Sequence, residues 1–295
     1  MKDSIRYVLV TGVNGMIGRR VAKELLDAKY NVLGISVEER SNIEDHCFVY
    51  KQLDLCNCWD VEKIFNEYPI SHVIHLAAIA HTKNQADLSW SRYYRINTLC
   101  AKTIFIEANK KNIPVLFSST VDVFGICNET VTNETEPNPI GYYAKSKFLA
   151  EKELHKICTN SKYTIVRFAP VYKKDDCRDI YKRFYIKEGK LCYKIGKGLS
   201  YEFLDLEKIA PFMLAWVNGV EKTEQIINLC DKEPHAVTKM INDEKKKNPK
   251  LITVHIPGWV ADSGYFCVLK VFGSQSMIVF TISKVVKPIK IKRMA

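Results

Sequence analysis

A glycine-rich turn between an apolar run and an amphipathic segment constrains the fold more than any other feature of this chain. Residues 5–10 form a β-rich run, and residues 17–26 carry apolar side chains at helical spacing. Gly12, Gly15 and Gly18 lie at the junction. A strand, a tight glycine turn and a helix in this order begin a βαβ unit, so the N-terminal part predicts an α/β fold.

The alternation of strands and helices continues through the first two-thirds of the 295 residues. Further strands are expected at 31–36, 47–50, 72–76, 114–117 and 163–167, and helices at 93–111 and 142–158. Short apolar strands separated by long helices favour a parallel sheet with helices on both faces. We expect an α/β protein with a Rossmann-type doubly wound parallel sheet and ligands at the carboxyl ends of its strands.

The strand–helix rhythm stops near residue 170. We expect a main domain over residues 1–170 and a smaller C-terminal lobe, mainly for substrate binding, over residues 171–295. Residues 203–230 contain two more strand-like runs, so this segment is expected to return to the main domain.

The glycine spacing predicts a site for a dinucleotide cofactor. Gly12 allows a tight turn, Gly15 lets a pyrophosphate approach the backbone, and Gly18 lets the helix pack closely on the sheet. The helix N-terminus adds unpaired N–H groups and a positive dipole end. The turn residues expected to bind the cofactor are Gly12, Asn14, Gly15, Met16, Ile17 and Gly18.

The end of the second strand bears on the choice between NAD and NADP. An acidic residue there binds the ribose 2′-hydroxyl and repels a 2′-phosphate. Ser36 stands at that point and Arg40 follows, which favours NADP slightly. Glu38 or Glu39 could still reach a 2′-hydroxyl, so NAD stays open. Asp54, after the third strand, is placed to accept from the adenine amino group.

Tyr143 and Lys147 lie one turn apart on an expected helix. A tyrosine pKa near ~10 is too high for a base at neutral pH, and a nearby ammonium favours the phenolate. Lys147 can also bind the nicotinamide ribose. Thr120, at the end of a strand, can present a hydroxyl to the substrate oxygen that Tyr143 addresses. These groups predict hydride chemistry at a carbinol or carbonyl carbon.

Together these motifs resemble the extended short-chain dehydrogenase/reductases of the NAD-dependent epimerase/dehydratase family, which act on nucleotide sugars. The matching stretches are 11–18, 54–55, 75–78, Asn97, 118–125, 136–139, 143–147 and 167–172. The resemblance implies catalysis by Thr120, Tyr143 and Lys147. The resemblance also implies a role for Asn97, which in the family supports the active-site helix. Further cofactor contacts are implied for Leu55, Leu76, Ala77, Ala78, Asn97, Ser118, Ser119, Tyr143, Lys147, Pro170 and Val171.

The resemblance leaves several reactions open. Dehydratases of the family carry Asp-Glu after the catalytic threonine, and Val121 and Asp122 stand here, which disfavours dehydration. We expect an epimerase acting at C4 of a nucleotide sugar through a transient 4-keto intermediate, with Tyr143 as acid and base. The alternative is an NADPH-dependent nucleotide-sugar 4-ketoreductase, and a remote one is a non-catalytic dinucleotide-binding sensor. NAD fits the epimerase and NADP the reductase.

The expected partners are a nucleotide-diphosphate sugar, with UDP the favoured carrier, and a second copy of the chain. Candidate substrate contacts are His81, Thr120, Arg183 and Lys197, although loop positions such as His81 suit a solvated side chain equally well. Homodimerisation through the helices at 93–111 and 142–158 is usual in the family.

Charge and cysteine content limit the partners and the cellular compartment that we expect for the protein. The net charge is +11, and from Lys232 onward twelve Lys/Arg face four Asp/Glu. We prefer a solvated basic face that attracts an anionic sugar nucleotide over one that binds RNA or an anionic membrane, and we expect no nucleic-acid partner. The ten scattered cysteines suit reduced thiols in the cytoplasm, without a metal site. No signal peptide is expected. No transmembrane segment is expected either, since Lys270 interrupts the most apolar late stretch.

Overall fold

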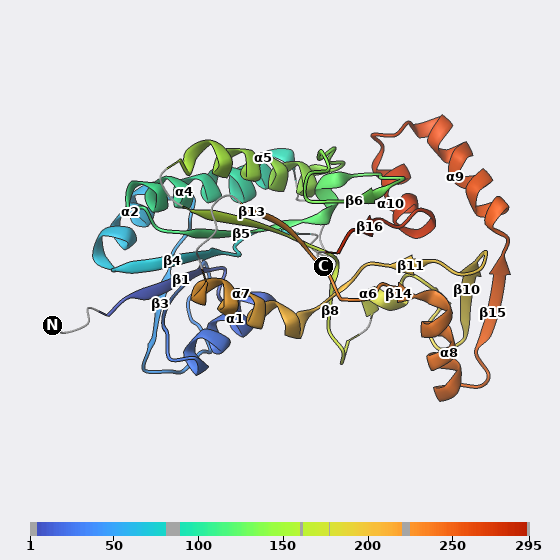
Figure 1. Ribbon diagram of the computed structural model, residues 1–295, viewed down its shortest axis with the longest axis horizontal. Helices are drawn as coiled ribbons and strands as arrows, with labels where there is room; N and C mark the ends of the chain where they lie inside the picture. The colour runs from blue at the N-terminus through green and yellow to red at the C-terminus, as the bar shows by residue number, and fades with distance from the viewer. Residues whose placement is uncertain (1–4, 81–88, 160–161, 177, 220–224, 294–295) are drawn as a thin grey trace. The chain divides into compact units, whose positions relative to one another are not determined.

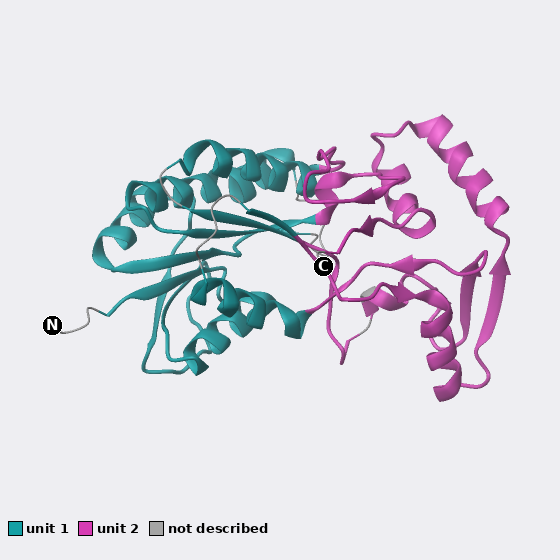
Figure 2. Ribbon diagram, viewed as in Figure 1, with its two compact units in different colours: residues 1–120, 142–167, 206–227 teal, residues 121–141, 168–205, 228–295 magenta. Residues whose placement is uncertain are grey.

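The computed structural model of the chain describes residues 5–80, 89–159, 162–176, 178–219 and 225–293 (Figure 1). The chain forms two compact units (Figure 2). Unit 1 comprises Met1–Thr120, Tyr142–Arg167 and Leu206–Ile227, and unit 2 comprises Val121–Gly141, Phe168–Asp205 and Asn228–Ala295. Each unit is described separately below.

A seven-stranded sheet forms the centre of unit 1. Its strands, in spatial order, are β13 (Gln225–Leu229), β7 (Tyr163–Phe168), β5 (Val115–Thr120), β4 (Ile70–His75), β1 (Tyr7–Thr11), β2 (Asn31–Ser36) and β3 (Phe48–Gln52). β1 pairs in parallel with β2 and β4, β2 with β3, and β4 with β5. The order reverses between β1 and β4, which is the switch point of a doubly wound sheet. The predicted fold class is confirmed.

Helices cover both faces of this sheet. They are α1 (Met16–Asp27), α2 (Cys58–Glu67), α3 (Trp90–Tyr93), the π-helical turn η2 (Tyr94–Leu99), α4 (Cys100–Lys110), α5 (Tyr142–Ile157), the 3₁₀ turn η4 (Leu206–Lys208) and α7 (Ile209–Asn218). α1 and α7 lie on one face, and α2, α4 and α5 on the other (Figure 1). Leu9, Phe105 and Leu154 are fully buried in the core on the latter face, each contributing about 1.5–3 kcal/mol.

Unit 2 is built from short strands and four helices within its described residues. Its elements are the 3₁₀ turn η3 (Val121–Phe124), β6 (Thr130–Val131), β8 (Val171–Tyr172), α6 (Arg178–Tyr181), β9 (Tyr185–Lys187), β10 (Leu191–Ile195), β11 (Ser200–Tyr201), β12 (Leu204–Asp205), β14 (His235–Ala236), α8 (Val237–Lys247), β15 (Ile252–Ile256), α9 (Gly258–Phe272), α10 (Met277–Val286) and β16 (Lys290–Ile291). The pairings are β15-β10-β9, β11-β14, β12-β8 and β16-β6. Phe184, Phe203 and Ile241 belong to a separate core of this unit.

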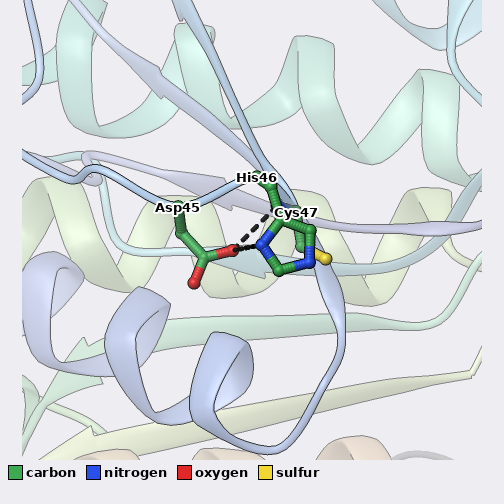
Figure 3. Close-up of side chains that lie close together, drawn as sticks. All are labelled: Asp45, His46 and Cys47. Atoms are coloured by element: carbon green, nitrogen blue, oxygen red, sulfur yellow. Dashed lines mark hydrogen bonds and ion pairs between the residues drawn. The ribbon is translucent and has the colours of Figure 1, made fainter.

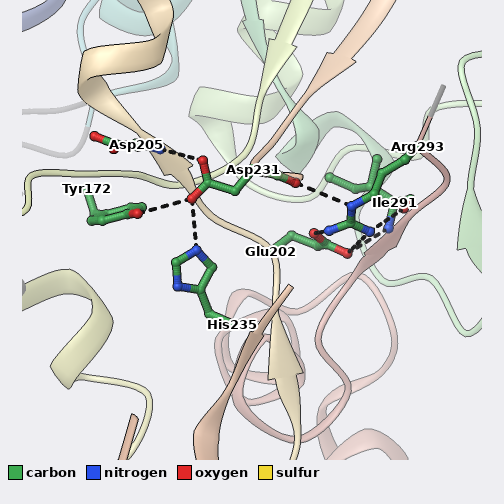
Figure 4. Close-up of polar contacts among 7 residues, drawn as sticks. All are labelled: Tyr172, Glu202, Asp205, Asp231, His235, Ile291 and Arg293. Carbon is green, nitrogen blue, oxygen red and sulfur yellow. Dashed lines mark hydrogen bonds and ion pairs between the residues drawn. The ribbon is translucent and has the colours of Figure 1, made fainter. Parts of the chain in front are cut away.

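A buried polar network lies within unit 2 (Figure 4). The Asp231 carboxylate accepts hydrogen bonds from the Tyr172 hydroxyl (3.1 Å) and the Asp205 backbone N–H (3.2 Å), and lies 2.8 Å from His235 Nε2. The Asp231 carbonyl oxygen accepts from Nε of Arg293. Arg293 also pairs with the Glu202 carboxylate at 2.6 Å, and this pair ties the last described residues to the unit.

The two units divide the chain differently from the expected boundary near residue 170. Residues 121–141 belong to unit 2, because β6 pairs in parallel with the distant β16. Residues 206–227 belong to unit 1, where the sequence led us to expect residues 203–230.

The expectation of reduced thiols is wrong for one pair of cysteines. Cys56 and Cys100 form a disulfide with a Cα–Cα distance of 4.8 Å. They are 44 residues apart in sequence, so spacing gave no sign of the bond; the fold brings the start of α4 beside the loop after β3. Cys177 lies outside the described residues. Of the described helices, none is both long and apolar enough to cross a membrane.

Candidate functional site

The glycine turn after β1 has the geometry that its spacing predicts. Gly12 has a φ of +66°, and a Cβ there would lie 2.9 Å from the backbone of Ala77. A Cβ on Gly18 would lie 2.3 Å from the Gly12 carbonyl oxygen, so only glycine allows α1 to begin this close to the turn. Gly15 is the N-cap of α1 and provides no side-chain cap, which leaves backbone N–H groups available to an anion.

A cavity of about 810 Å³ opens beside this turn, entirely within unit 1. Its size and largely apolar walls fit a cofactor site. Eight of its lining residues are predicted cofactor contacts: Gly12, Gly15, Ser36, Asp54, Leu55, Leu76, Ala77 and Ala78. The glycine cradle and the cavity together fit a dinucleotide, with the pyrophosphate over Gly12 and Gly15.

The cavity wall near the end of β2 contains one of the two acids that the sequence left as candidates. Glu38 lines the cavity, and the Ser36 hydroxyl donates a hydrogen bond to its carboxylate. This bond, with further polar contacts, lowers the pKa of Glu38. Arg40 lies elsewhere: its side chain is 82% exposed and 3.9 Å from Glu39. Glu38 lines the cavity and Arg40 does not, which favours NAD over the slight preference for NADP drawn from Ser36 and Arg40.

The disulfide between Cys56 and Cys100 also lines the cavity. Asp54 is a further lining residue, and its Oδ1 accepts a hydrogen bond from the Cys56 backbone N–H at 3.0 Å. The disulfide therefore joins the loop carrying the predicted adenine contact to the start of α4.

Two arginines, one on α3 and one on the π-helical turn η2, were not predicted. Arg92 and Arg95 line the cavity beside Ser91 and Ile96. Their guanidinium groups suit the phosphates of a bound nucleotide. The signal was present in the sequence, since two arginines three residues apart precede Asn97 on the same helical stretch.

Asn97 connects the end of β4 to the helix that carries Tyr143. Its side-chain oxygen accepts from the Ile79 backbone N–H (2.8 Å), and its amide donates to the Ile79 carbonyl oxygen (2.9 Å) and to the Ser146 hydroxyl (3.0 Å). The Ser146 hydroxyl donates in turn to the Tyr143 carbonyl oxygen at 2.8 Å. Thr98 donates to the Ser146 carbonyl oxygen. The π-helical turn thus fixes the first turn of α5 against the cavity edge.

Lys147 is buried on the same helix. Burial lowers the pKa of Lys147 to about 7, while the Glu151 carboxylate acts in the opposite direction. Its Nζ lies 4.3 Å from the centre of the Phe117 ring on β5. A phenolate at Tyr143 or the phosphates of a bound cofactor would favour the charged form, so the side chain can respond to an occupied site near neutral pH.

His75, at the end of β4, is held neutral below the cavity. Burial and the Lys147 charge lower its pKa to about 3. The Thr11 hydroxyl accepts from the backbone N–H groups of Leu76 and Ala77 (3.2 Å each), so its hydrogen points to His75 Nδ1 at 2.9 Å. Nδ1 is then an acceptor, and the proton sits on Nε2, which has no partner among the described residues. This histidine positions the loop rather than transferring protons.

Thr120 ends β5 and is 8% exposed, at the carboxyl edge of the sheet. The preceding serines are tied to the scaffold: Ser118 donates to the His75 carbonyl oxygen (3.0 Å), and Ser119 donates to Glu151 (2.5 Å). Glu151 is also held by Arg167 at 2.7 Å. These bonds fix the strand end that presents the Thr120 hydroxyl.

Other predicted residues lie away from the cavity or outside the described chain. The Asn14 amide donates to the Arg40 carbonyl oxygen (2.8 Å) and so braces the loop after β2. Arg183, in unit 2, has its guanidinium 5.6 Å from the Tyr201 ring centre, and Lys197 is exposed. His81 lies outside the described residues. The predicted cofactor contacts that are not among the residues lining the cavity are Asn14, Met16, Ile17, Gly18, Arg40, Asn97, Ser118, Ser119, Tyr143, Lys147, Pro170 and Val171; the predicted catalytic Thr120 does not line it either.

Among the described residues, two groups of acidic and cysteine or histidine side chains lie close enough together to resemble metal ligands. In the first, Asp45 accepts from the Cys47 backbone N–H at 2.8 Å and faces His46 (Figure 3). These neighbours form an ordinary turn before β3. The second comprises Asp54 and the disulfide-bonded Cys56 and Cys100, whose sulfurs are not free thiolates. The absence of a metal site stays a prediction.

Comparison with protein families identifies the group to which this arrangement belongs. The model of the NAD dependent epimerase/dehydratase family matches residues 8–230, which include the glycine turn, Asn97 and the Tyr143–Lys147 pair. The chain belongs to this family. The resemblance predicted from the motifs is confirmed, and the cofactor named by the family agrees with the carboxylate of Glu38 in the cavity wall.

Individual relatives of the chain are more distant. It is 21% identical over 268 residues to N-acetyl-alpha-D-glucosaminyl-diphospho-ditrans,octacis-undecaprenol 4-epimerase of Escherichia coli O157:H7, covering 88% of this chain and 78% of that one. It is 26% identical to GDP-6-deoxy-D-talose 4-dehydrogenase of Aggregatibacter actinomycetemcomitans over 165 residues, 54% of this chain and about half (51%) of that relative. The UDP-Glc/GlcNAc 4-epimerase structure from Campylobacter jejuni has a TM-score of 0.71 at 19% identity, covering 85% of this chain and 87% of that one.

Proposed function

We propose that the protein is an NAD-dependent epimerase that inverts C4 of a diphosphate-linked sugar, with a UDP-sugar as the favoured substrate. The observation that carries the proposal is the fixed first turn of α5. Asn97 and Ser146 hold the turn that bears Tyr143, and Lys147 is buried one turn further along. This arrangement supports Tyr143 and Lys147 as the acid–base pair of the reaction.

Proton transfer at C4 is the task of these side chains. Tyr143 takes the proton of the C4 hydroxyl as a hydride leaves C4, giving the 4-keto sugar, and returns it when a hydride adds to the opposite face. Lys147 favours the phenolate, and Thr120 hydrogen-bonds the same oxygen. Bound NAD supplies the hydride acceptor and donor. The sugar is oxidised and then reduced at one carbon, so the cycle consumes no external oxidant.

The choice of NAD rests on Glu38. Its carboxylate can accept from both ribose hydroxyls of the adenosine and would repel a 2′-phosphate. Ser36 orients it from the end of β2. A recycled cofactor suits an epimerase, whereas a reductase must exchange its cofactor every turnover.

The relatives support C4 as the reacting carbon. Both sequence relatives described above carry the position 4 in their names, one as an epimerase and one as a dehydrogenase. The first acts on a sugar linked through a diphosphate to a polyprenol. We therefore propose UDP as the carrier of the sugar that this enzyme acts on, and we also propose a homodimeric state and a cytoplasmic location.

The test is product analysis without added cofactor. The purified protein is incubated with UDP-GlcNAc or UDP-glucose, and the C4 epimers are separated by chromatography. Conversion that reaches equilibrium supports the epimerase, and Tyr143→Phe should abolish it while NAD binding persists. Denaturation should release close to one NAD per chain. An empty site, together with turnover of a 4-keto sugar only when NADPH is added, would establish the reductase instead.

A further inference from the structure

Helix α9 exposes apolar side chains along most of its surface. Its sequence from Gly258 to Phe272 contains one acid and one lysine, and Tyr265 is the residue of this helix that is buried. Trp259 is 72% exposed, Phe266 53% and Val271 74%. Helices this apolar are normally buried, and at fifteen residues α9 is too short to cross a bilayer.

Trp259 and Phe266, unlike Val271, form a stripe along one side of the helix. Trp259 and Phe266 are seven residues apart, so they lie on the same side of the helix. Lys270 follows Phe266 by one turn, and its Nζ lies 4.6 Å from the centre of that ring. Helices that lie in a membrane interface typically carry aromatic rings close to lysine, as α9 does.

Further apolar side chains are exposed where α9 turns into α10. Phe272, Met277 and Ile278 flank the connection and are each about half exposed. The two helices pack against each other within unit 2 (Figure 1). The exposed apolar surface therefore spans a helix pair, which exceeds the isolated apolar residues common on soluble proteins.

The charge around this helix pair is positive on balance. Residues 251–295 contain six Lys/Arg and the single acid Asp262. Three of the six are ion-paired at 2.6 Å: Lys287 with Asp262, Lys284 with Asp122 and Arg293 with Glu202. The other three, Lys270, Lys290 and Lys292, keep this part of the chain positive. A second copy would present the same positive charge to this surface and be repelled by it, whereas an anionic phospholipid surface complements both the charge and the apolar stripe.

We propose that α9 and its junction with α10 dock the protein on an anionic phospholipid surface, with α9 lying in the plane of the interface. This attachment to lipid does not depend on whether the enzyme is an epimerase. In this arrangement α9 does not cross the bilayer; Trp259 and Phe266 insert among the headgroups and Lys270 meets lipid phosphates.

Vesicle binding of the full-length protein tests the proposal. We expect the protein to co-sediment with vesicles that contain phosphatidylglycerol and far less with pure phosphatidylcholine, and to be released by high salt. The double variant Trp259→Ser/Phe266→Ser should weaken binding at least about tenfold. Lys270→Glu should also weaken it, with a smaller dependence on salt.

Trp59 offers a matched control. It is 77% exposed on α2 of unit 1, so Trp59→Ser removes an equally exposed indole from another part of the chain and should leave vesicle binding unchanged. Brominated lipids should quench the fluorescence of Trp59→Ser, which keeps Trp259, and should not quench that of Trp259→Ser. Circular dichroism and turnover of each variant report whether the fold persists.

Two results would overturn the proposal. One is equal sedimentation of the wild type and the double variant with anionic vesicles. The other is a dimer in light scattering that the double variant dissociates, without vesicle binding by the wild type. The second result would assign the stripe to an interface between copies.

Discussion

The Ser36 hydroxyl hydrogen-bonds the Glu38 carboxylate in the wall of the dinucleotide cavity. Many dinucleotide folds place the acid at the end of β2 itself. Here a serine occupies that position and orients an acid two residues later. The two side chains together hold a carboxylate at the cavity, and we infer that this carboxylate selects NAD.

Replacing Glu38 by glutamine should change the cofactor preference. We expect Glu38→Gln to weaken NAD binding roughly tenfold, since a charge-assisted hydrogen bond to the ribose is lost. NADP binding should strengthen, because the repulsion of the 2′-phosphate disappears. Calorimetric titration of both cofactors measures the two effects.

The neighbouring acid serves as the control for this change. Glu39 is 79% exposed and faces Arg40, so Glu39→Gln should alter neither affinity. Equal affinity of the wild type for NAD and NADP would contradict the assignment of Glu38.

Asn97 should matter more for turnover than its neighbour Thr98. Asn97→Ala leaves the Ile79 backbone N–H and carbonyl oxygen without their partners and frees the Ser146 hydroxyl. We expect a loss of about 1–3 kcal/mol in the free energy of unfolding, and a fall in kcat with little change in substrate KM.

Thr98→Val is the comparison, because it removes one bond to α5 but keeps those to Ile79. If the two variants lose the same fraction of kcat at equal stability, Asn97 does not position Tyr143 as we infer.

The burial of Lys147 predicts an unusual dependence of stability on pH. Its pKa in the folded protein is about 7, below the ordinary 10.5. Between these values the unfolded chain binds more protons, so the contribution of Lys147 to stability rises with pH. Below pH about 7 the folded protein bears the full cost of a buried ammonium.

Lys147→Met should therefore stabilise the protein without cofactor, by on the order of 1–3 kcal/mol near pH 6, although it abolishes turnover. The gain should shrink as the pH rises to about 9. Thermal unfolding across this range measures it, and the exposed Lys145→Met on the same helix should show a constant difference. A gain that does not vary with pH would mean that Lys147 keeps its ordinary pKa.

Local patterns predicted the glycine turn, the alternation of strands and helices and the Tyr143–Lys147 pair, because each depends on residues close in sequence or on a regular alternation. The Cys56–Cys100 bond depends on how distant segments meet, which spacing does not encode. Arg92 and Arg95 were visible as a pair on one helical stretch, but their place in the cavity wall was not. The expected continuous helix over residues 93–111 contains a π-helical turn at Asn97, where tertiary hydrogen bonds override local preference. The apolar composition of α9 was visible in the sequence, but its exposure was not.

The disulfide should stabilise both the fold and the cofactor site. Cys56 and Cys100 join segments 44 residues apart, so reducing the bond releases a large loop in the unfolded chain. We expect Cys100→Ala to lower the free energy of unfolding by about 2–4 kcal/mol. It should also weaken NAD binding, since both cysteines line the cavity beside Asp54.

Reduction separates this effect from a change in packing. Dithiothreitol should lower the unfolding temperature of the wild type and of Cys58→Ser, which removes an exposed free thiol beside the pair. It should leave Cys100→Ala unaffected, because that variant has already lost the bond. Peptide mapping of the wild type without reductant should recover the linked Cys56 and Cys100 peptides. If the reductant changes neither the unfolding temperature nor the map, the two sulfurs are thiols in solution and the loop after β3 is held by packing and by the Asp54 hydrogen bond alone.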